Sequence, residues 1–286
     1  MAYNGGSDPT LAELITAKFV PEIFSKDVFM HTKSKLVAQT AFNTTYKNDL
    51  RKGSKVWIPL FSEGSATDVT PGTEPTASDL ANATAASVTV DNWKQAAAES
   101  SDLMQIENMA DYLKGAAISC AYSIQKAVDT SVGALFSTLA TSSVYGSQNQ
   151  TFTDEIFRAL VETLDALDIP EEDRVLIGDS STKRDLTDIS KYIATDYVRN
   201  PVVPTGVIGQ LYGSKVLFTN NLTAVSTSNY GVYAHKDAIG IAIQKNPRSR
   251  VYDMGYKFIS KVIVDCAWGA NVTRTTFGKS FYTRAS

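Results

Sequence analysis

The stretch that decides the fold runs from residue 102 to residue 140 and reads DLMQIENMADYLKGAAISCAYSIQKAVDTSVGALFSTLA. Its apolar residues recur at steps of three or four positions, which is the spacing of one face of an α-helix. They are Leu103, Ile106, Ala110, Leu113, Ala117, Ala121, Ile124, Val128, Val132, Leu135 and Leu139. An unbroken helix of this length would span about 55 Å. The sequence therefore predicts one long helix that crosses the molecule, with Cys120 beside its buried face.

Two short strands precede this helix and enclose a long excursion. Residues 56–61 (VWIPLF) predict a strand in which Pro59 favours a position at the sheet edge. Residues 87–91 (SVTVD) alternate as a returning strand does. Residues 62–86 are rich in Ser, Thr, Ala, Gly and Pro and offer little to a core, and so long an excursion is unusual inside a compact domain. We therefore expect an extended hairpin arm that reaches another subunit.

The rest of the chain predicts an α+β fold with a middle domain inserted between the long helix and C-terminal strands. Polar residues 141–152 indicate a linker, and Thr153 is placed to cap a helix from Asp154 to Leu167. Residues 8–50 predict one or two helices interrupted at Pro21. The other expected elements are a strand at 174–178, a helix at 182–197, strands at 215–219, 232–235 and 239–243, and one or two long strands within 255–276.

Length and composition narrow the class of protein. The chain has 286 residues, of which 43% are hydrophobic and 20% charged, as in ordinary folded proteins. Its net charge of −3 argues against a dedicated nucleic-acid binder. No apolar run approaches the roughly 20 residues that cross a bilayer, and the first ten residues resemble no secretory signal. Two distant cysteines, Cys120 and Cys266, fit a reducing compartment.

Charge is distributed unevenly along the chain. Residues 56–93 contain five Asp or Glu and no Lys or Arg, a net charge of −5. Residues 244–286 contain eight Lys or Arg against two Asp, a net charge of +6. Solvated surfaces can carry such clusters by chance. The alternative is that the acidic arm and the basic C-terminal region meet, within one subunit or between subunits.

Motifs for catalysis, cofactors and metals are weak, so we expect none of these sites. Gly278-Lys279-Ser280 ends like a phosphate-binding loop, but Thr273 stands where the first glycine belongs. His235-Lys-Asp237 could contribute to a Ser-His-Asp site, but the sequence has no G-x-S-x-G turn. With two histidines and two cysteines, a His/Cys metal site is not expected. The sequence predicts a protein that is not an enzyme.

Several segments resemble a known family when taken in order. They are Val56-Trp-Ile-Pro59 with Thr70-Pro-Gly72, Ser87-Val-Thr-Val-Asp91 with Glu99-Ser-Ser-Asp102, Ala121-Tyr122 with Ala127-Val-Asp129, Ile208 to Val216 with Thr219-Asn-Asn221, and His235-Lys-Asp-Ala238. Through their joint order over roughly residues 50–275, the chain resembles the major capsid protein of tailed double-stranded DNA bacteriophages, which has the Hong Kong 97-type fold. The resemblance implies five segments: an N-terminal arm (1–50), an E-loop hairpin (51–98), a P-domain spine helix (99–150), an A-domain (151–250) and C-terminal P-domain strands (251–286).

The resemblance also implies a function and partners. The expected protein is a structural subunit that assembles through pentamers and hexamers into an icosahedral shell around packaged double-stranded DNA. Its expected partners are further copies of itself, a separate scaffolding protein, portal and decoration proteins, and DNA through non-specific contact, with no membrane and no cofactor. The expected location is the virion, after assembly in the host bacterial cytoplasm.

Charge and resemblance together predict an inter-subunit surface in which the acidic arm faces basic residues of a neighbour. The candidate residues are Trp57, Glu63, Asp68, Glu74, Asp79, Arg248, Arg250, Lys257 and Lys261, with the basic positions of residues 26–55 as the alternative partners of the arm. Covalently linked shells of this family join an E-loop lysine to a neighbour's asparagine. Because no lysine occurs between Val56 and Trp93, we expect no such cross-link here.

Three other classes of protein remain open on the sequence. An encapsulin-type compartment has the same fold but encloses protein cargo instead of DNA. An unrelated α+β enzyme would need a cleft around His235. An adhesin or tail protein would suit the Thr-rich β segments but not the long helix.

Overall fold

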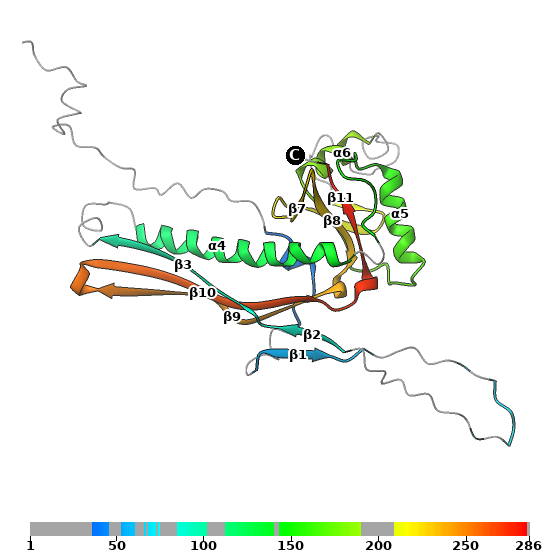
Figure 1. The fold of residues 1–286 in the computed structure, drawn as a ribbon, viewed down its shortest axis with the longest axis horizontal. Coiled ribbons are helices and arrows are strands. Elements are labelled where there is room, and N and C mark those ends of the chain that lie inside the picture. Colours follow the sequence, from blue (N-terminus) through cyan, green and yellow to red (C-terminus); the bar gives the residue numbers. More distant parts are fainter. Residues whose placement is uncertain are drawn as a thin grey trace, which may run out of the picture.

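The computed structural model describes residues 36–45, 53–60, 66, 68–72, 74, 85–101, 112–139, 143–189 and 209–284. An elongated part carries a long helix against a three-stranded sheet, and a compact part surrounds a six-stranded sheet (Figure 1). A separate two-stranded hairpin lies beside the junction of the two parts. The mixture of helix and sheet agrees with the predicted α+β class.

The long helix is α4 (Tyr112–Ala134), which continues as the 3-10 turn η3 (Leu135–Leu139). Residues 102–111 and 140 of the predicted helix lie outside the described residues. Its inward face carries Ile124, Val128 and Val132, all buried, which confirms the helical periodicity. The helix narrows to a 3-10 turn at its end. There the hydroxyls of Ser137 and Thr138 donate hydrogen bonds to the backbone carbonyls three residues earlier, which compete with the hydrogen bonds of a regular α-helix.

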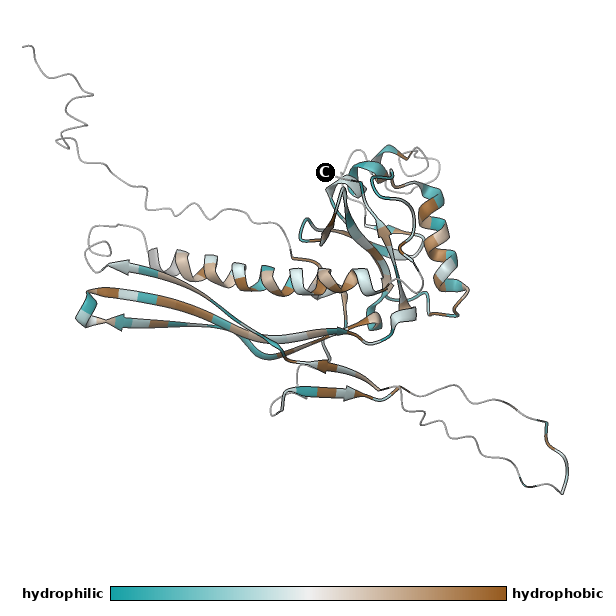
Figure 2. Cartoon of the chain, viewed as in Figure 1, coloured by the Kyte–Doolittle hydropathy of each residue, from teal (hydrophilic) through white to brown (hydrophobic). Residues whose placement is uncertain are grey.

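A three-stranded antiparallel sheet lies against α4. Its strands are β3 (Asn92–Ser101), β10 (Ile259–Val272) and β9 (Ile239–Met254), in that order. Alternate side chains of β10 face the helix and are buried: Val262, Val264, Cys266 and Trp268. Figure 2 shows apolar colour along β10 and paler, mixed colours along α4.

Strand β3 is missing from the sequence expectation, which led directly from residue 91 towards the long helix. Its sequence, NWKQAAAESS, shows no apolar alternation beyond alanine. Ala96 and Ala98 supply the face that packs against the core under α4. Pairing along ten residues of β10 therefore determines this strand, rather than its own hydrophobic pattern.

The hairpin at the junction consists of β1 (Lys55–Ile58) and β2 (Ala86–Thr89), which confirms both predicted strands flanking the arm. Val88 is fully buried against Ala242 of β9. A Cβ at Gly269 would lie 1.9 Å from the carbonyl oxygen of Thr89. Only glycine therefore lets β2 cross this closely over β10.

The six-stranded sheet follows the order β11-β8-β4-β6-β5, with β7 paired to β8. Its strands are β4 (Arg174–Gly178), β5 (Gln210–Leu211), β6 (Ser214–Phe218), β7 (Ala224–Val225), β8 (Ser228–His235) and β11 (Gly278–Tyr282). Helix α5 (Asp154–Asp165) packs Phe157 and Leu160 into its core. The Thr153 hydroxyl accepts from the backbone N–H of Ile156, which confirms the predicted cap.

Short elements complete the described fold. They are α2 (Ala38–Ala41), α6 (Ser180–Asp188), η4 (Lys236–Ala238), η5 (Gly255–Lys257) and η6 (Thr275–Phe277). The predicted helix at 182–197 is confirmed as far as α6, and residues 190–208 lie outside the described part of the chain. In the predicted N-terminal helical region, only residues 36–45 are described.

The five-segment division of the chain stays a prediction, but its last two segments do not coincide with the sheets. Strand β9 runs through residue 250 because it pairs with β10 from Ile239 to Met254. After β10, the chain returns to the compact part, where β11 pairs with β8. Residues 278–282 therefore belong to the six-stranded sheet.

Candidate inter-subunit surface

The acidic arm presents its described residues to solvent. Asp68 and Glu74 are exposed, and Val69 between them is 89% exposed. Trp57 on β1 is 61% exposed, with the Lys55 ammonium 3.8 Å from its ring centroid. Glu63 and Asp79 lie outside the described residues. Single exposed apolar side chains are ordinary on a protein surface, so the exposure of Trp57 and Val69 leaves the inter-subunit surface a prediction.

Arg248 on β9 already has a carboxylate partner in its own chain. Its Nε and Nη2 lie 2.8 and 3.0 Å from the two carboxylate oxygens of Asp265 on β10. This two-point hydrogen bond holds the pKa of Asp265 down at about 2 and raises the pKa of Arg248. The Trp93 indole also donates to Asp265 at 3.4 Å. Arg248 is therefore less available to a neighbour than the sequence suggested.

Lys261 on β10 is paired in the same way. Its Nζ lies 2.7 Å from a carboxylate oxygen of Glu99 on β3, and this hydrogen bond lowers the pKa of Glu99. The strand register places the two residues directly opposite each other. Lys261 and Arg248 thus stabilise the sheet across its two strand pairs, a role that the sequence pattern did not indicate.

The other two basic candidates lie near the free end of the β9–β10 hairpin and contact aromatic rings. A guanidinium nitrogen of Arg250 lies 3.3 Å from the Tyr252 hydroxyl, and the Lys257 ammonium lies 5.5 Å from the Tyr256 ring centroid. Both cations are exposed. Of the four predicted basic residues, these two form no salt bridge with a carboxylate within the described residues, although the charge of Lys257 helps to lower the pKa of Glu99.

The same end of the hairpin exposes apolar side chains that the sequence analysis placed differently. The alternating apolar residues Phe258, Val262 and Val264 predict one buried strand face, yet Phe258 is 73% exposed. The chain adopts a positive φ of 53° at Phe258 as it leaves η5, which breaks the alternation. Exposed residues around it are Val251, Tyr252 and Tyr256.

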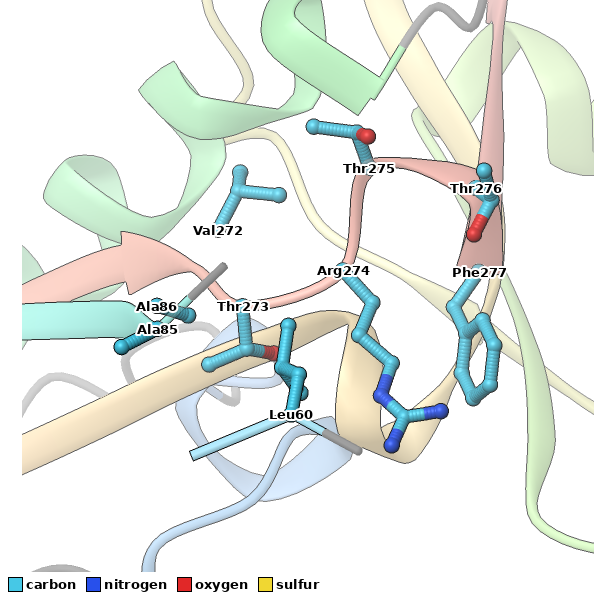
Figure 3. Close-up of a pocket in the computed structure, with 9 residues that line it drawn as sticks. All are labelled: Leu60, Ala85, Ala86, Val272, Thr273, Arg274, Thr275, Thr276 and Phe277. Carbon is cyan, nitrogen blue, oxygen red and sulfur yellow. The ribbon is translucent and has the colours of Figure 1, made fainter. Parts of the chain in front are cut away.

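A pocket of about 430 Å³ lies where the arm leaves and rejoins the hairpin (Figure 3). Its lining residues are Leu60, Ala85, Ala86, Val272, Thr273, Arg274, Thr275, Thr276 and Phe277. The Arg274 guanidinium lies 4.6 Å from the centroid of the Phe277 ring, a cation–π contact that holds the cation at the pocket. No sequence pattern indicates this pocket, because three separate segments of the chain build it.

The motifs tested for chemistry have structural roles here. Gly278-Lys-Ser280 begins β11 instead of forming a loop, and Lys279 is buried. The Nδ1 atom of His235 accepts from the backbone N–H of Asp237 at 3.2 Å, and its ring meets Phe277 edge-on. Within the described ranges, no group of three His, Cys, Asp or Glu side chains is arranged to hold a metal ion. No helix in the described part of the chain is long and apolar enough to cross a membrane.

Comparison with known proteins identifies the fold. No protein-family model and no curated protein matches the sequence. A chain from Mycobacterium phage Che8 is 19% identical with a TM-score of 0.78, over 92% of this chain and 97% of that one. A capsid chain of cyanophage P-SCSP1u is 15% identical with a TM-score of 0.74, over 100% and 97%. A capsid chain of a native GTA particle is 13% identical with a TM-score of 0.71, over 96% and 100%.

These likenesses extend over nearly the whole length of both chains in each pair. The protein therefore has the fold of phage capsid subunits, as the resemblance in its sequence implied. At these levels of identity the likeness concerns the fold, and function is argued separately below.

Proposed function

We propose that this protein is a major capsid protein, a structural subunit that assembles through pentamers and hexamers into an icosahedral shell around double-stranded DNA. The observation that carries the proposal is the match to capsid chains over nearly the whole length of both chains. The described residues of the arm are exposed, which leaves them accessible to a neighbouring subunit. The virion is then its location, with assembly in the host bacterial cytoplasm.

The further partners belong to the same proposal. A separate scaffolding protein, a portal protein and decoration proteins would complete assembly, while DNA is contacted without sequence specificity. The net charge of −3 supports weak DNA contact, because strong binding requires many Lys or Arg residues on phosphates. The subunit acts as a wall component, and no catalytic step is assigned to it.

Contacts between subunits would include electrostatic attraction between the acidic arm and the basic residues of a neighbour. Arg250 and Lys257 support this role better than Arg248 and Lys261, because the last two already pair with carboxylates of their own sheet. Single exposed pairs contribute little, about 0–1 kcal/mol. Repetition around a shell would still set the register and the rate of association.

The test is expression of the full chain, with and without a co-expressed scaffolding protein, followed by negative-stain electron microscopy. Regular hollow shells are the expected result, and a monomer under every condition would contradict the proposal. Nucleic-acid and protein analysis of shells from phage-infected cells separates a capsid from a protein-filled encapsulin-type compartment. Shell yield should fall with rising ionic strength and on reversal of the charges of Glu63 and Asp68. If shell yield depends on neither ionic strength nor these charges, the electrostatic contacts between subunits are refuted, and the capsid proposal itself still stands.

A further inference from the structure

The pocket at the root of the arm combines an apolar floor with a cation. Leu60 is the last described residue after β1, and Ala85 is the first described residue before β2, so the pocket lies directly at the base of the arm. Val272 and Ala86 add further apolar surface. Figure 3 shows Arg274 and the Phe277 ring side by side along one wall. This chemistry fits an aliphatic side chain that has a carboxylate next to it.

Arg274 has a free charge for such a ligand. Among the described residues, its guanidinium contacts the Phe277 ring and makes no ion pair with a carboxylate. The backbone N–H of Arg274 is bonded to the carbonyl of Ala238, so the side chain is carried on a fixed main chain. Thr275 and Thr276, both exposed at the pocket, add hydroxyl groups that can donate to an anion.

The far end of the arm presents the complementary chemistry. Val69 is 89% exposed, with Asp68 before it and Glu74 shortly after it, both exposed. A turn at Pro71-Gly72, in which Gly72 has a φ of 91°, separates the valine from the glutamate. The arm has no Lys or Arg between residues 56 and 93, so its carboxylates have no cation within the arm.

We propose that the arm tip of one copy, residues 68–74, binds the root pocket of a second copy. Val69 enters the apolar part of the pocket, and Asp68 or Glu74 pairs with Arg274. Figure 1 shows the described tip residues far from the body of their own chain, so a second copy is the occupant that the geometry favours. This inference rests on the proposed function, because it requires copies of the chain to assemble.

The contact has a defined symmetry. The arm tip and the root pocket are different surfaces of one chain, so the contact is head-to-tail. The tip of each copy binds the pocket of the next copy. Head-to-tail contacts close into a ring when the rotation between copies allows it. The inference thus connects the arm to ring formation without a separate partner protein.

A disulfide experiment tests the pairing directly. Cysteine is introduced at the tip by Thr70→Cys and at the pocket by Ala85→Cys, while the native Cys120 and Cys266 are buried. After mild oxidation, the double variant should give a ladder of covalent oligomers on a non-reducing denaturing gel. A mixture of the two single variants should give dimers only. A disulfide within one chain, or shells that form without any cross-link, would overturn the pairing.

A charge exchange provides the second test. Arg274→Glu should lower shell yield at least tenfold, and adding Asp68→Lys and Glu74→Lys to the same chain should restore most of it. Restoration also excludes misfolding as the cause of the loss. Lys126→Glu makes the same charge change on the exposed side of α4 and should leave the yield unchanged.

The outcomes separate this inference from the proposed function. Wild-type shells with normal assembly of Arg274→Glu would refute the tip-to-pocket contact and leave the capsid proposal standing. Failure of the wild-type chain to form shells under any condition would refute the capsid proposal itself. Rescue of Arg274→Glu by a charge-reversed scaffolding protein, with the arm unchanged, would assign the pocket to that protein and overturn the inference.

Discussion

Arg248 and Asp265 join β9 to β10 through two parallel hydrogen bonds of 2.8 and 3.0 Å. The pair lies on the side of the sheet away from α4, where Trp93 adds a third contact to the carboxylate. A planar guanidinium facing a carboxylate is the geometry in which such a pair is strongest. It keeps the long strands in register where the β-bulge after Asp265 interrupts their pairing.

The first prediction concerns acid stability. The pKa of Asp265 is about 2, below its ordinary unfolded value of about 3.9, so the pair stabilises the fold fully above about pH 4. That contribution is lost as the pH falls from about 4 towards 2. In Arg248→Ala, the pKa of Asp265 should rise towards its ordinary range, because the guanidinium is the main cause of its shift. Carboxyl NMR titration of the unassembled subunit measures it, and an unchanged pKa would contradict the assignment.

The second prediction concerns a buried carboxylate on α4. Asp129 is fully buried and accepts hydrogen bonds from the backbone N–H of Ala38 at 2.7 Å and the Asn221 amide at 3.1 Å. It thereby connects α2, α4 and the segment after β6. Asp129→Asn should lower the free energy of unfolding by about 1–3 kcal/mol, because an amide cannot accept at both positions.

Urea unfolding of the unassembled subunit checks this value, with Gln125→Ala as the control. Gln125 is exposed on the same helix, so its replacement should change the stability by less than about 0.5 kcal/mol. Equal stability of Asp129→Asn and wild type would show that the carboxylate does not hold the three segments together.

The third prediction concerns the crossing of β2 over β10. In Gly269→Ala the new methyl group would meet the Thr89 carbonyl oxygen, so the hairpin must shift, at a cost of about 1–3 kcal/mol. Gly255→Ala, at the end of the same sheet, has no heavy atom within 4 Å of the added Cβ and serves as the control. Thermal unfolding should separate the two variants by several degrees. If both melt alike, the hairpin does not rest on this contact.

The fourth prediction concerns covalent linkage between subunits. Because residues 56–93 contain no lysine, the arm cannot supply the amine of an isopeptide bond to a neighbour. Purified shells boiled in denaturant and reductant should therefore run as single subunits on a gel. A ladder of higher species under those conditions would contradict the prediction.

The sequence predicts those helices and strands that carry a periodic apolar pattern or a capping residue of their own. The long helix follows from apolar steps of three and four, and the start of α5 follows from Thr153 before Asp154. Strand β3 could not be predicted in this way, because alanine and charged residues between Trp93 and Ser100 favour a strand only when β10 is beside them.

The candidate surface was predicted less completely, for a related reason. Net charge along the chain located the arm and the basic C-terminal region, but it could not reveal which charges meet inside one subunit. Asp265 and Glu99 pair with Arg248 and Lys261 only because strand register brings them together. Arg274 is likewise one cation among many until the fold brings Leu60 and Ala85 beside it.

The place where the β1–β2 hairpin attaches to the sheet determines how far the arm can reach. Its contacts with the sheet include the packing of Val88 on Ala242, the Gly269 crossing, and hydrogen bonds from the Asn271 amide to the Ser87 carbonyl and from the Gln244 amide to the Gly53 carbonyl. The chain from Leu60 to Pro71 can span at most about 40 Å, so a tilt of the hairpin by about 10° displaces the tip by about 7 Å. A small rotation of the hairpin on the sheet therefore produces a large displacement of the arm tip. The same folded body could then meet neighbours at different angles, with the difference absorbed where the hairpin attaches to the sheet.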